Sequence, residues 1–182
     1  IPYFMPQDEA LTVGPLDQMR RHRFVTSWVY DLPDVSQSNA VVRAALNGWQ
    51  VTGIVQFQTG QPYTITSGTD ISRDGIGGDR AKTTGVSTDP LAGSDQTVWF
   101  NPAAFAVGDV GTFGTIGKGV YVGPNTHYWD LGLTRNINIA NGQSFQFRAE
   151  LFNILNQVNF PNPATAFNSA WLGRITSTHP NQ

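Results

Sequence analysis

The chain has 182 residues, a formal net charge of -2 and only 13% charged residues, whereas an average soluble domain has roughly 25%. It has no cysteine, which excludes disulfides and thiolate metal sites, and the absence of a basic patch argues against nucleic-acid binding. No stretch approaches the ~20 apolar residues of a transmembrane helix. The 19 Gly and 11 Pro favour long irregular loops over a helix bundle.

Two amphipathic strands are predicted in the first third of the chain. The first covers residues 21–32, where Phe24, Thr26, Trp28, Tyr30 and Leu32 share one face. Residues 39–47 predict a short helical turn. The second strand covers residues 49–59 and is expected to resume at residues 63–66 after Pro62, which lacks a backbone donor and marks a bulge, an edge or the rim of the sheet.

A long connection and a second pair of strands follow. Residues 68–125 hold 12 of the 19 Gly and show little periodicity, and a connection this long is usually functional or disordered. Residues 126–156 predict two long strands joined by the turn Asn141-Gly142-Gln143. In the first of them Arg135 interrupts an apolar face. In the second, an apolar set alternates with a polar one, namely Phe145, Phe147, Ala149 and Leu151 with Gln146, Arg148 and Glu150.

Strand length and alternation together predict the fold class. A transmembrane β-strand needs roughly 9–11 residues, against about 5–6 in an average strand. We therefore expect an all-β fold, an antiparallel meander that forms part of a large transmembrane β-barrel with long extracellular loops. Short turns alternating with long loops are typical of bacterial outer-membrane barrels. The open alternative is a soluble all-β carbohydrate-binding module, in which the same strands form a sandwich.

Several segments, in the same order along nearly the whole chain, resemble the barrel strands of TonB-dependent outer-membrane receptors, and most closely the Oar-like branch that is similar to carboxypeptidase-regulatory-domain receptors. The matching segments are Arg21-His22-Arg23-Phe24 to Tyr30-Asp31-Leu32-Pro33, Gly48-Trp49-Gln50-Val51-Thr52-Gly53, Thr59-Gly60-Gln61-Pro62-Tyr63, Trp99-Phe100-Asn101-Pro102-Ala103-Ala104-Phe105, Gly111-Thr112-Phe113-Gly114 and Phe147-Arg148-Ala149-Glu150-Leu151-Phe152-Asn153-Ile154-Leu155-Asn156.

The resemblance implies the C-terminal part of a barrel of about 22 strands that imports a ligand across the bacterial outer membrane with energy relayed by TonB. No TonB box, plug domain or closing strand is recognisable in residues 1–182. We therefore expect a partial, non-enzymatic barrel region. Its partners would be outer-membrane lipid, the rest of the receptor barrel and plug, TonB through an N-terminal region, and an unknown imported ligand. If the turn at residues 141–143 is periplasmic, residues 34–47 are periplasmic, and residues 68–125 and 157–182 are extracellular.

A calcium loop is the sharpest local pattern. Residues 70–79 place oxygen-bearing side chains at alternate positions followed by Gly75, as at the start of a calcium-binding loop. The predicted Ca²⁺ ligands are Asp70, Ser72, Asp74, the Ile76 carbonyl and Asp79. The pattern departs from an EF-hand because position twelve is Ala81 rather than Glu. An Asp/Gly-rich turn held by side-chain to backbone hydrogen bonds is the alternative.

Other chemistry has weaker support in the sequence. His22, His127 and His179 share no metal-ligand spacing, and no Gly-x-Ser-x-Gly elbow is present. A hydrolase would need a site that sequence spacing hides. Glu9 and Glu150 are the only glutamates, and a polar row or an ion pair with Arg148 explains Glu150 better than glycoside hydrolysis. The loop aromatics either stack on a sugar or, as we expect, pack the loops: Trp99, Phe100, Phe105, Phe113, Tyr121 and Trp171.

Overall fold

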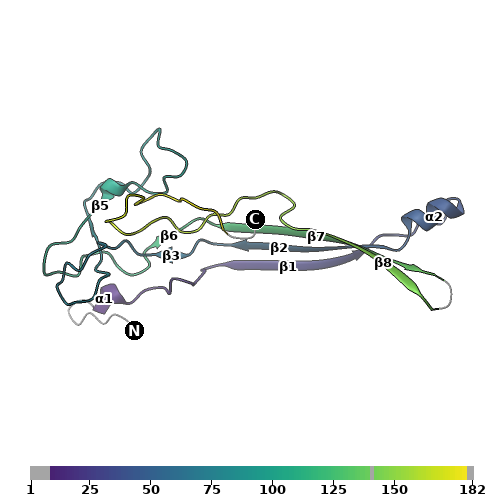
Figure 1. Ribbon diagram of the computed structural model, residues 1–182, viewed down its shortest axis with the longest axis horizontal. Coiled ribbons are helices and arrows are strands. Elements are labelled where there is room, and N and C mark those ends of the chain that lie inside the picture. The colour runs from purple at the N-terminus through teal and green to yellow at the C-terminus, as the bar shows by residue number, and fades with distance from the viewer. Residues whose placement is uncertain (1–8, 140–141, 180–182) are drawn as a thin grey trace. The chain divides into compact units, whose positions relative to one another are not determined.

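A computed structural model describes residues 9–139 and 142–179. The described residues divide into two compact units, one formed by residues 23–58, 126–139 and 142–158 and the other by residues 9–22, 59–125 and 159–179. We call them the sheet unit and the loop unit. Asn141 of the predicted turn lies outside the described residues. The elements, shown in Figure 1, are α1 (Glu9–Thr12), β1 (Arg23–Asp31), α2 (Ala40–Leu46), β2 (Trp49–Gln58), β3 (Pro62–Tyr63), β4 (Lys82–Thr83), the 3-10 helix η1 (Pro102–Ala104), β5 (Phe105–Ala106), β6 (Tyr121–Val122), β7 (Thr126–Asn138) and β8 (Ser144–Leu151).

The sheet unit is one antiparallel sheet with the strand order β1-β2-β7-β8. All three neighbouring pairs therefore join long strands that follow each other in the sequence, and the predicted all-β antiparallel meander is confirmed. The pairing is staggered, since β2 pairs with residues 126–135 of β7 whereas β8 pairs with residues 131–138. A stagger of this kind accompanies the strand tilt of a barrel wall. Within the described residues the sheet is open, with β1 and β8 at its edges.

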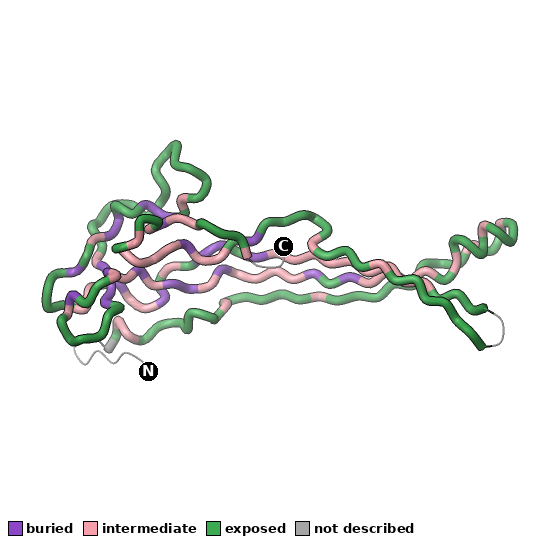
Figure 2. Tube along the Cα trace, viewed as in Figure 1, coloured by how far each residue is buried: buried purple, intermediate pink, exposed green. Residues whose placement is uncertain are grey.

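The edge strands are also the most exposed ones. Every residue of β1 except Thr26 is exposed, and every residue of β8 except Ala149. The central strands β2 and β7 are mostly half-buried, as Figure 2 shows by the change from green to pink. Among the described residues no helix has the length and apolar character needed to cross a membrane.

The structure corrects two predicted strand boundaries. The last strand ends at Leu151 rather than at Asn156, because Asn153 and Asn156 take positive φ angles of 48° and 49°, which Asn tolerates better than most residues. Residues 63–66 do not continue the second strand. Pro62 and Tyr63 pair with β6 in a separate two-stranded sheet of the loop unit, which agrees with an edge position for Pro62.

The predicted helical turn is present as α2. The Asn39 side chain accepts a hydrogen bond from the Val42 backbone N–H at 2.9 Å and so caps the N-terminus. The base of this connection is closed by a second asparagine, since Asn47 Oδ1 accepts from Val35 N at 2.8 Å. Short polar side chains thus fix both ends of the link between β1 and β2.

The loop unit has a core of its own despite its short strands. The core cluster consists of Tyr63, Ile65, Ala81, Phe100, Ala104, Phe105 and Ile116. Four aromatic rings meet there. Tyr63 stacks on Phe100 and Tyr121 at centroid distances of 6.1 and 5.9 Å. Phe105 contacts Phe100 and Tyr121 edge to face, each at 5.3 Å. The prediction that loop aromatics pack the loops is confirmed for Phe100, Phe105 and Tyr121.

Burial and a close backbone approach shape this unit further. Burial raises the pKa of Tyr63, although a hydrogen bond with the Trp99 side chain lowers it in part. At the base of residues 59–125, Gly60 N donates to Asn125 Oδ1 at 3.0 Å, and a Cβ on Gly60 would lie 1.8 Å from the Gly123 carbonyl oxygen. Only glycine fits there without a backbone shift.

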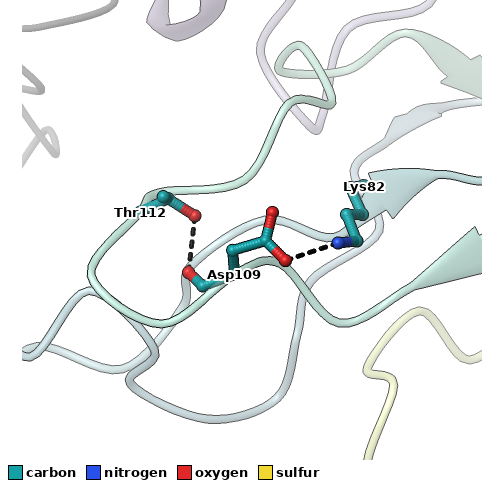
Figure 3. A network of polar contacts seen from close by, with 3 residues as sticks. All are labelled: Lys82, Asp109 and Thr112. Carbon is teal, nitrogen blue, oxygen red and sulfur yellow. Dashed lines mark hydrogen bonds and ion pairs between the residues drawn. The ribbon is translucent and has the colours of Figure 1, made fainter.

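A surface network ties a loop to β4. Lys82 Nζ lies 2.6 Å from Asp109 Oδ1, and the Thr112 hydroxyl donates to the Asp109 carbonyl at 2.6 Å (Figure 3). The Asp109 side chain is 76% exposed, so water screens this pair and we expect it to contribute only about 0–1 kcal/mol.

Candidate membrane-facing surface and ligand groove

The pairing register assigns every residue of the four long strands to one of two faces, because directly paired residues in antiparallel strands lie on the same side. We define the apolar face by the rows that contain Trp28, Gly53 and Leu131. Its members are Phe24, Thr26, Trp28, Tyr30, Trp49, Val51, Gly53, Val55, Phe57, His127, Trp129, Leu131, Leu133, Arg135, Ile137, Phe145, Phe147, Ala149 and Leu151.

The opposite face is mainly polar and carries the hydrogen bonds between strands. Gln50 Nε2 donates to Asp31 Oδ1 at 2.8 Å, and Gln146 Nε2 donates to Asn136 Oδ1 at 2.9 Å. Arg148 and Glu150 form an ion pair on it. The interpretation of Glu150 as part of a polar row with Gln146 and Arg148 therefore agrees with the structure. Four larger apolar residues also lie on this face: Val25, Val29, Ile54 and Tyr128.

Aromatic side chains on the apolar face form two clusters at opposite ends of β2. At one end the Phe57 ring lies 6.3 Å from Phe24, 5.1 Å from His127 and 5.7 Å from Trp129. At the other end Trp49 meets Phe147 edge to face at 5.8 Å. The eight residue steps from Trp49 to Phe57 span about 26 Å at roughly 3.3 Å per residue.

This spacing matches a membrane barrel. At a strand tilt of about 40°, the two clusters lie about 20 Å apart along the barrel axis, close to the apolar band of about 25 Å that aromatic girdles flank in outer-membrane proteins.

Residues 3–182 match the family described as outer membrane beta barrel domain. The chain belongs to this family. No curated protein and no solved structure matches it significantly.

Membership explains the two faces of this outer-membrane barrel domain. Its place in the bacterial outer membrane requires an outward apolar surface and a polar interior. The apolar face is accordingly the lipid side of the barrel domain, and the face with Asp31, Gln50 and Glu150 is the lumenal side. On this face Phe24, Tyr30 and Phe145 are between 55% and 59% exposed. Exposure of this extent is expected of large apolar side chains that contact lipid in the membrane.

The predicted calcium loop is built on backbone hydrogen bonds. Asp70 accepts from Arg73 N at 2.7 Å, from Gly75 N at 2.9 Å and from the Ser72 hydroxyl at 3.2 Å. Desolvation raises the pKa of Asp70, but the hydrogen bonds that it accepts together outweigh this effect, so the pKa lies below its ordinary value of 3.8. Asp74 Oδ1 accepts from Ile76 N at 2.9 Å. The turn stabilised by side chains, stated above as the alternative, accounts for these contacts.

Asp79 is the buried member of this loop. Its Oδ2 accepts from Ile71 N at 2.6 Å and from Ser72 N at 2.7 Å, whereas its Oδ1 has no donor in the described part of the chain. Within the same residues, no three His, Asp or Glu side chains gather as a group able to hold a metal. Calcium binding by Asp70, Ser72, Asp74, Ile76 and Asp79 stays a prediction.

An open groove of about 550 Å³ lies in the loop unit. Two exposed rings line it, Trp171 at 58% exposure and Phe160 at 41%. Arg174 lies on the same wall, 3.6 Å from Asp95 Oδ2 and donating to Thr97 Oγ1 at 3.3 Å. Exposed rings beside hydroxyl and charged groups offer both stacking and hydrogen bonding to a ligand.

The sequence did not indicate this groove, because its walls come from distant segments. Residues 97–99 meet residues 173–175 through backbone hydrogen bonds, with Ile175 N donating to Thr97 O at 2.8 Å and Trp99 N to Gly173 O at 2.7 Å. The sequence groups Trp171 with the aromatics expected to pack the loops, but its exposed ring separates it from Phe100 and Phe105, which are each 3% exposed.

Proposed function

We propose that the chain forms part of the barrel wall and the ligand-capturing loops of a TonB-dependent outer-membrane receptor. The observation that carries the proposal is the two-faced sheet combined with unequal connections. At one end of the sheet the strands are joined through residues 32–48 and 139–143, whereas β2 and β7 are joined at the other end through residues 59–125. Long loops at one rim of a barrel are the usual place for ligand capture.

The groove is the proposed point of capture. It combines the exposed rings of Trp171 and Phe160 with the Arg174 and Asp95 pair, so it offers contacts to an amphiphilic ligand rather than to a purely apolar one. The core cluster of the same unit keeps Phe100 and Phe105 buried, and Phe100 N donates to the carbonyl of Gly173, the neighbour of Arg174 in the groove wall. A groove whose wall is already held in place before binding has a low ordering cost when it binds a ligand.

The proposed role is non-enzymatic transport. Membership in an outer-membrane barrel family gives no support to the soluble carbohydrate-binding module or to the hydrolase. Within the proposal, imported ligand passes through a lumen lined by the polar face, and energy comes from TonB through an N-terminal region of the receptor.

A ligand-free test addresses the TonB step. The full-length receptor that carries this chain is purified from outer membranes and passed over immobilised periplasmic C-terminal domain of TonB. We expect retention, and loss of retention when the N-terminal region before the barrel is deleted. Equal flow-through of both forms would reject the TonB assignment while leaving the barrel itself intact.

A further inference from the structure

Arg135 is the one strongly charged side chain on the apolar face as defined above. It pairs with Trp49 in the last row shared by β2 and β7, so it stands at the end of the sheet that carries the short connections. Its guanidinium lies over the Trp49 ring at 5.3 Å from the centroid. A cation in that position gains from the ring quadrupole.

The guanidinium also holds the end of α2. Arg135 NH1 donates to the Ala45 carbonyl at 3.0 Å, and NH2 donates to the Ala44 carbonyl. Trp49 Nε1 donates to the same Ala45 carbonyl at 2.9 Å. The last carbonyls of a helix have no partner within the helix and attract positive charge. Two residues of the apolar face thus fix α2 on the lipid side of the barrel.

The surface of α2 is unusually apolar for a segment with no buried residue. Val41 is 78% exposed and Leu46 is 51% exposed. At about 100° per residue, Val41, Val42 and Leu46 span an arc of about 140° that does not include Arg43. The helix is therefore amphipathic, with Arg43 beside the Leu46 edge of the apolar arc, and its C-terminal turn is bonded to Trp49, whose ring contacts Phe147.

We propose that α2 is a membrane-interfacial anchor that sits in the lipid headgroup layer. Val41 and Leu46 contact the acyl boundary, and Arg43 reaches the anionic phosphate groups of the lipids. Arg135 sets the angle of the helix by holding its C-terminal carbonyls. The occupant of this surface is lipid, because the surface is continuous with the lipid-facing wall of an outer-membrane barrel and carries positive charge. The proposal depends on the barrel and not on TonB.

Single-cysteine spin labels test this placement, since the chain has no cysteine of its own. Val41→Cys and Arg43→Cys are compared with Val110→Cys, a loop-unit position that is 67% exposed. The full-length protein is labelled and reconstituted in phosphatidylethanolamine and phosphatidylglycerol vesicles. Collision with oxygen is then measured against collision with a water-soluble nickel chelate.

We expect oxygen to dominate for the label at position 41, the nickel chelate to dominate for the label at position 110, and an intermediate ratio at position 43. Equal ratios at positions 41 and 110 would overturn the proposal. A label at position 41 that is shielded from both reagents would also overturn it, because a protein and not lipid would then cover α2.

A second variant tests the role of Arg135 as a positioning residue. Arg135→Lys keeps a charge but cannot donate to two carbonyls in the fork geometry of a guanidinium. In this background we expect the label at position 41 to become more mobile and its oxygen preference to fall, with the label at position 110 unchanged. Unchanged mobility and accessibility at position 41 would show that Arg135 does not orient α2.

Discussion

The indole ring of Trp28 lies over the backbone of Gly53 on the lipid-facing side of the sheet. The two residues are direct partners in the β1 to β2 pairing, and a Cβ on Gly53 would lie 2.3 Å from Trp28 Cε2. The ring fills the space that a side chain at position 53 would otherwise occupy. An aromatic residue thereby covers a glycine in the middle of a transmembrane strand.

A double-mutant cycle follows from this contact. Gly53→Ala alone should destabilise the protein by about 1–3 kcal/mol, because the ring must leave its place. In a Trp28→Ala background the same change should stabilise by roughly 0.5–1 kcal/mol, since alanine orders a strand better than glycine. Urea unfolding in vesicles, read from the shift between folded and unfolded bands on gels, measures both. Equal signs in the two backgrounds would contradict the packing described.

The assignment of the faces predicts the effect of added charge. Leu131→Arg places a cation on the lipid face between the two aromatic clusters, where it should cost about 2–4 kcal/mol. Thr52→Arg, on the lumenal face beside Gly53 and paired with the uncharged Val29 and Gly132, should change stability by about 0.5 kcal/mol or less. The same urea titration compares them. A larger loss for Thr52→Arg would reverse the two faces.

The strand assignments show what sequence alone could and could not give. Alternation placed Phe145 and Gln146 on opposite faces correctly, because a two-residue period follows from strand geometry whatever the partner. The alternation could not predict that Tyr63 pairs outside the four-stranded sheet, because the periodicity of a strand does not indicate which strand it pairs with. The pattern predicts a strand that continues beyond Leu151, because nothing in it shows that Asn153 and Asn156 adopt positive φ.

The two candidate sites differ in the same way. The hydrogen bonds of Asp70 are local, and the sequence indicated a side-chain-stabilised turn there as one of two alternatives. The groove depends on contacts between Thr97 and Ile175, and the anchor on contacts between Arg135 and Ala45. Such long-range contacts leave no spacing to recognise. The position of Arg135, which interrupts the apolar face predicted for its strand, is explained only by its contacts with α2.

Membrane orientation is predicted from the unequal connections. With the loop unit outside the cell, Val110→Cys should react with a membrane-impermeant maleimide on intact bacteria. Ser36→Cys, in the link between β1 and β2, should react only after the outer membrane is made permeable. Mass spectrometry of the labelled peptides reads the result. Reaction at position 36 but not at position 110 on intact cells would invert the topology.

The loop at residues 70–79 should open in acid. The folded-state pKa of Asp70 is below its ordinary value of 3.8, so the contribution of this carboxylate is complete above that value and is lost as the pH falls through the folded-state pKa. Hydrogen exchange of a peptide spanning the loop, corrected for intrinsic rates, should therefore accelerate in acid. Asp70→Asn should show the faster exchange already at neutral pH, whereas Asp89→Asn, in another loop, should not.

Calcium binding by the same loop is tested by calorimetry. If a cation recruits the free Oδ1 of Asp79 together with Asp74, wild-type protein should give a saturable heat with CaCl₂, and Asp74→Ala should abolish it. Ser87→Ala, outside the loop, serves as the control and should bind as wild type does. Absence of heat in all three proteins would leave the backbone hydrogen bonds as the sole function of these carboxylates.

The contact at the base of residues 59–125 has a consequence for the order of folding. Bringing the ends of a long flexible chain together costs entropy that grows slowly with its length, about 0.6 kcal/mol for each doubling. The pairing of β3 with β6 and the hydrogen bond from Gly60 to Asn125 close this segment on its own. Once the loop core has formed, the end of β2 and the start of β7 are held close together, as they would be if a short turn joined them. Variants that melt this core, such as Phe100→Ala, should therefore slow insertion of the sheet into membranes, although position 100 lies outside the sheet unit.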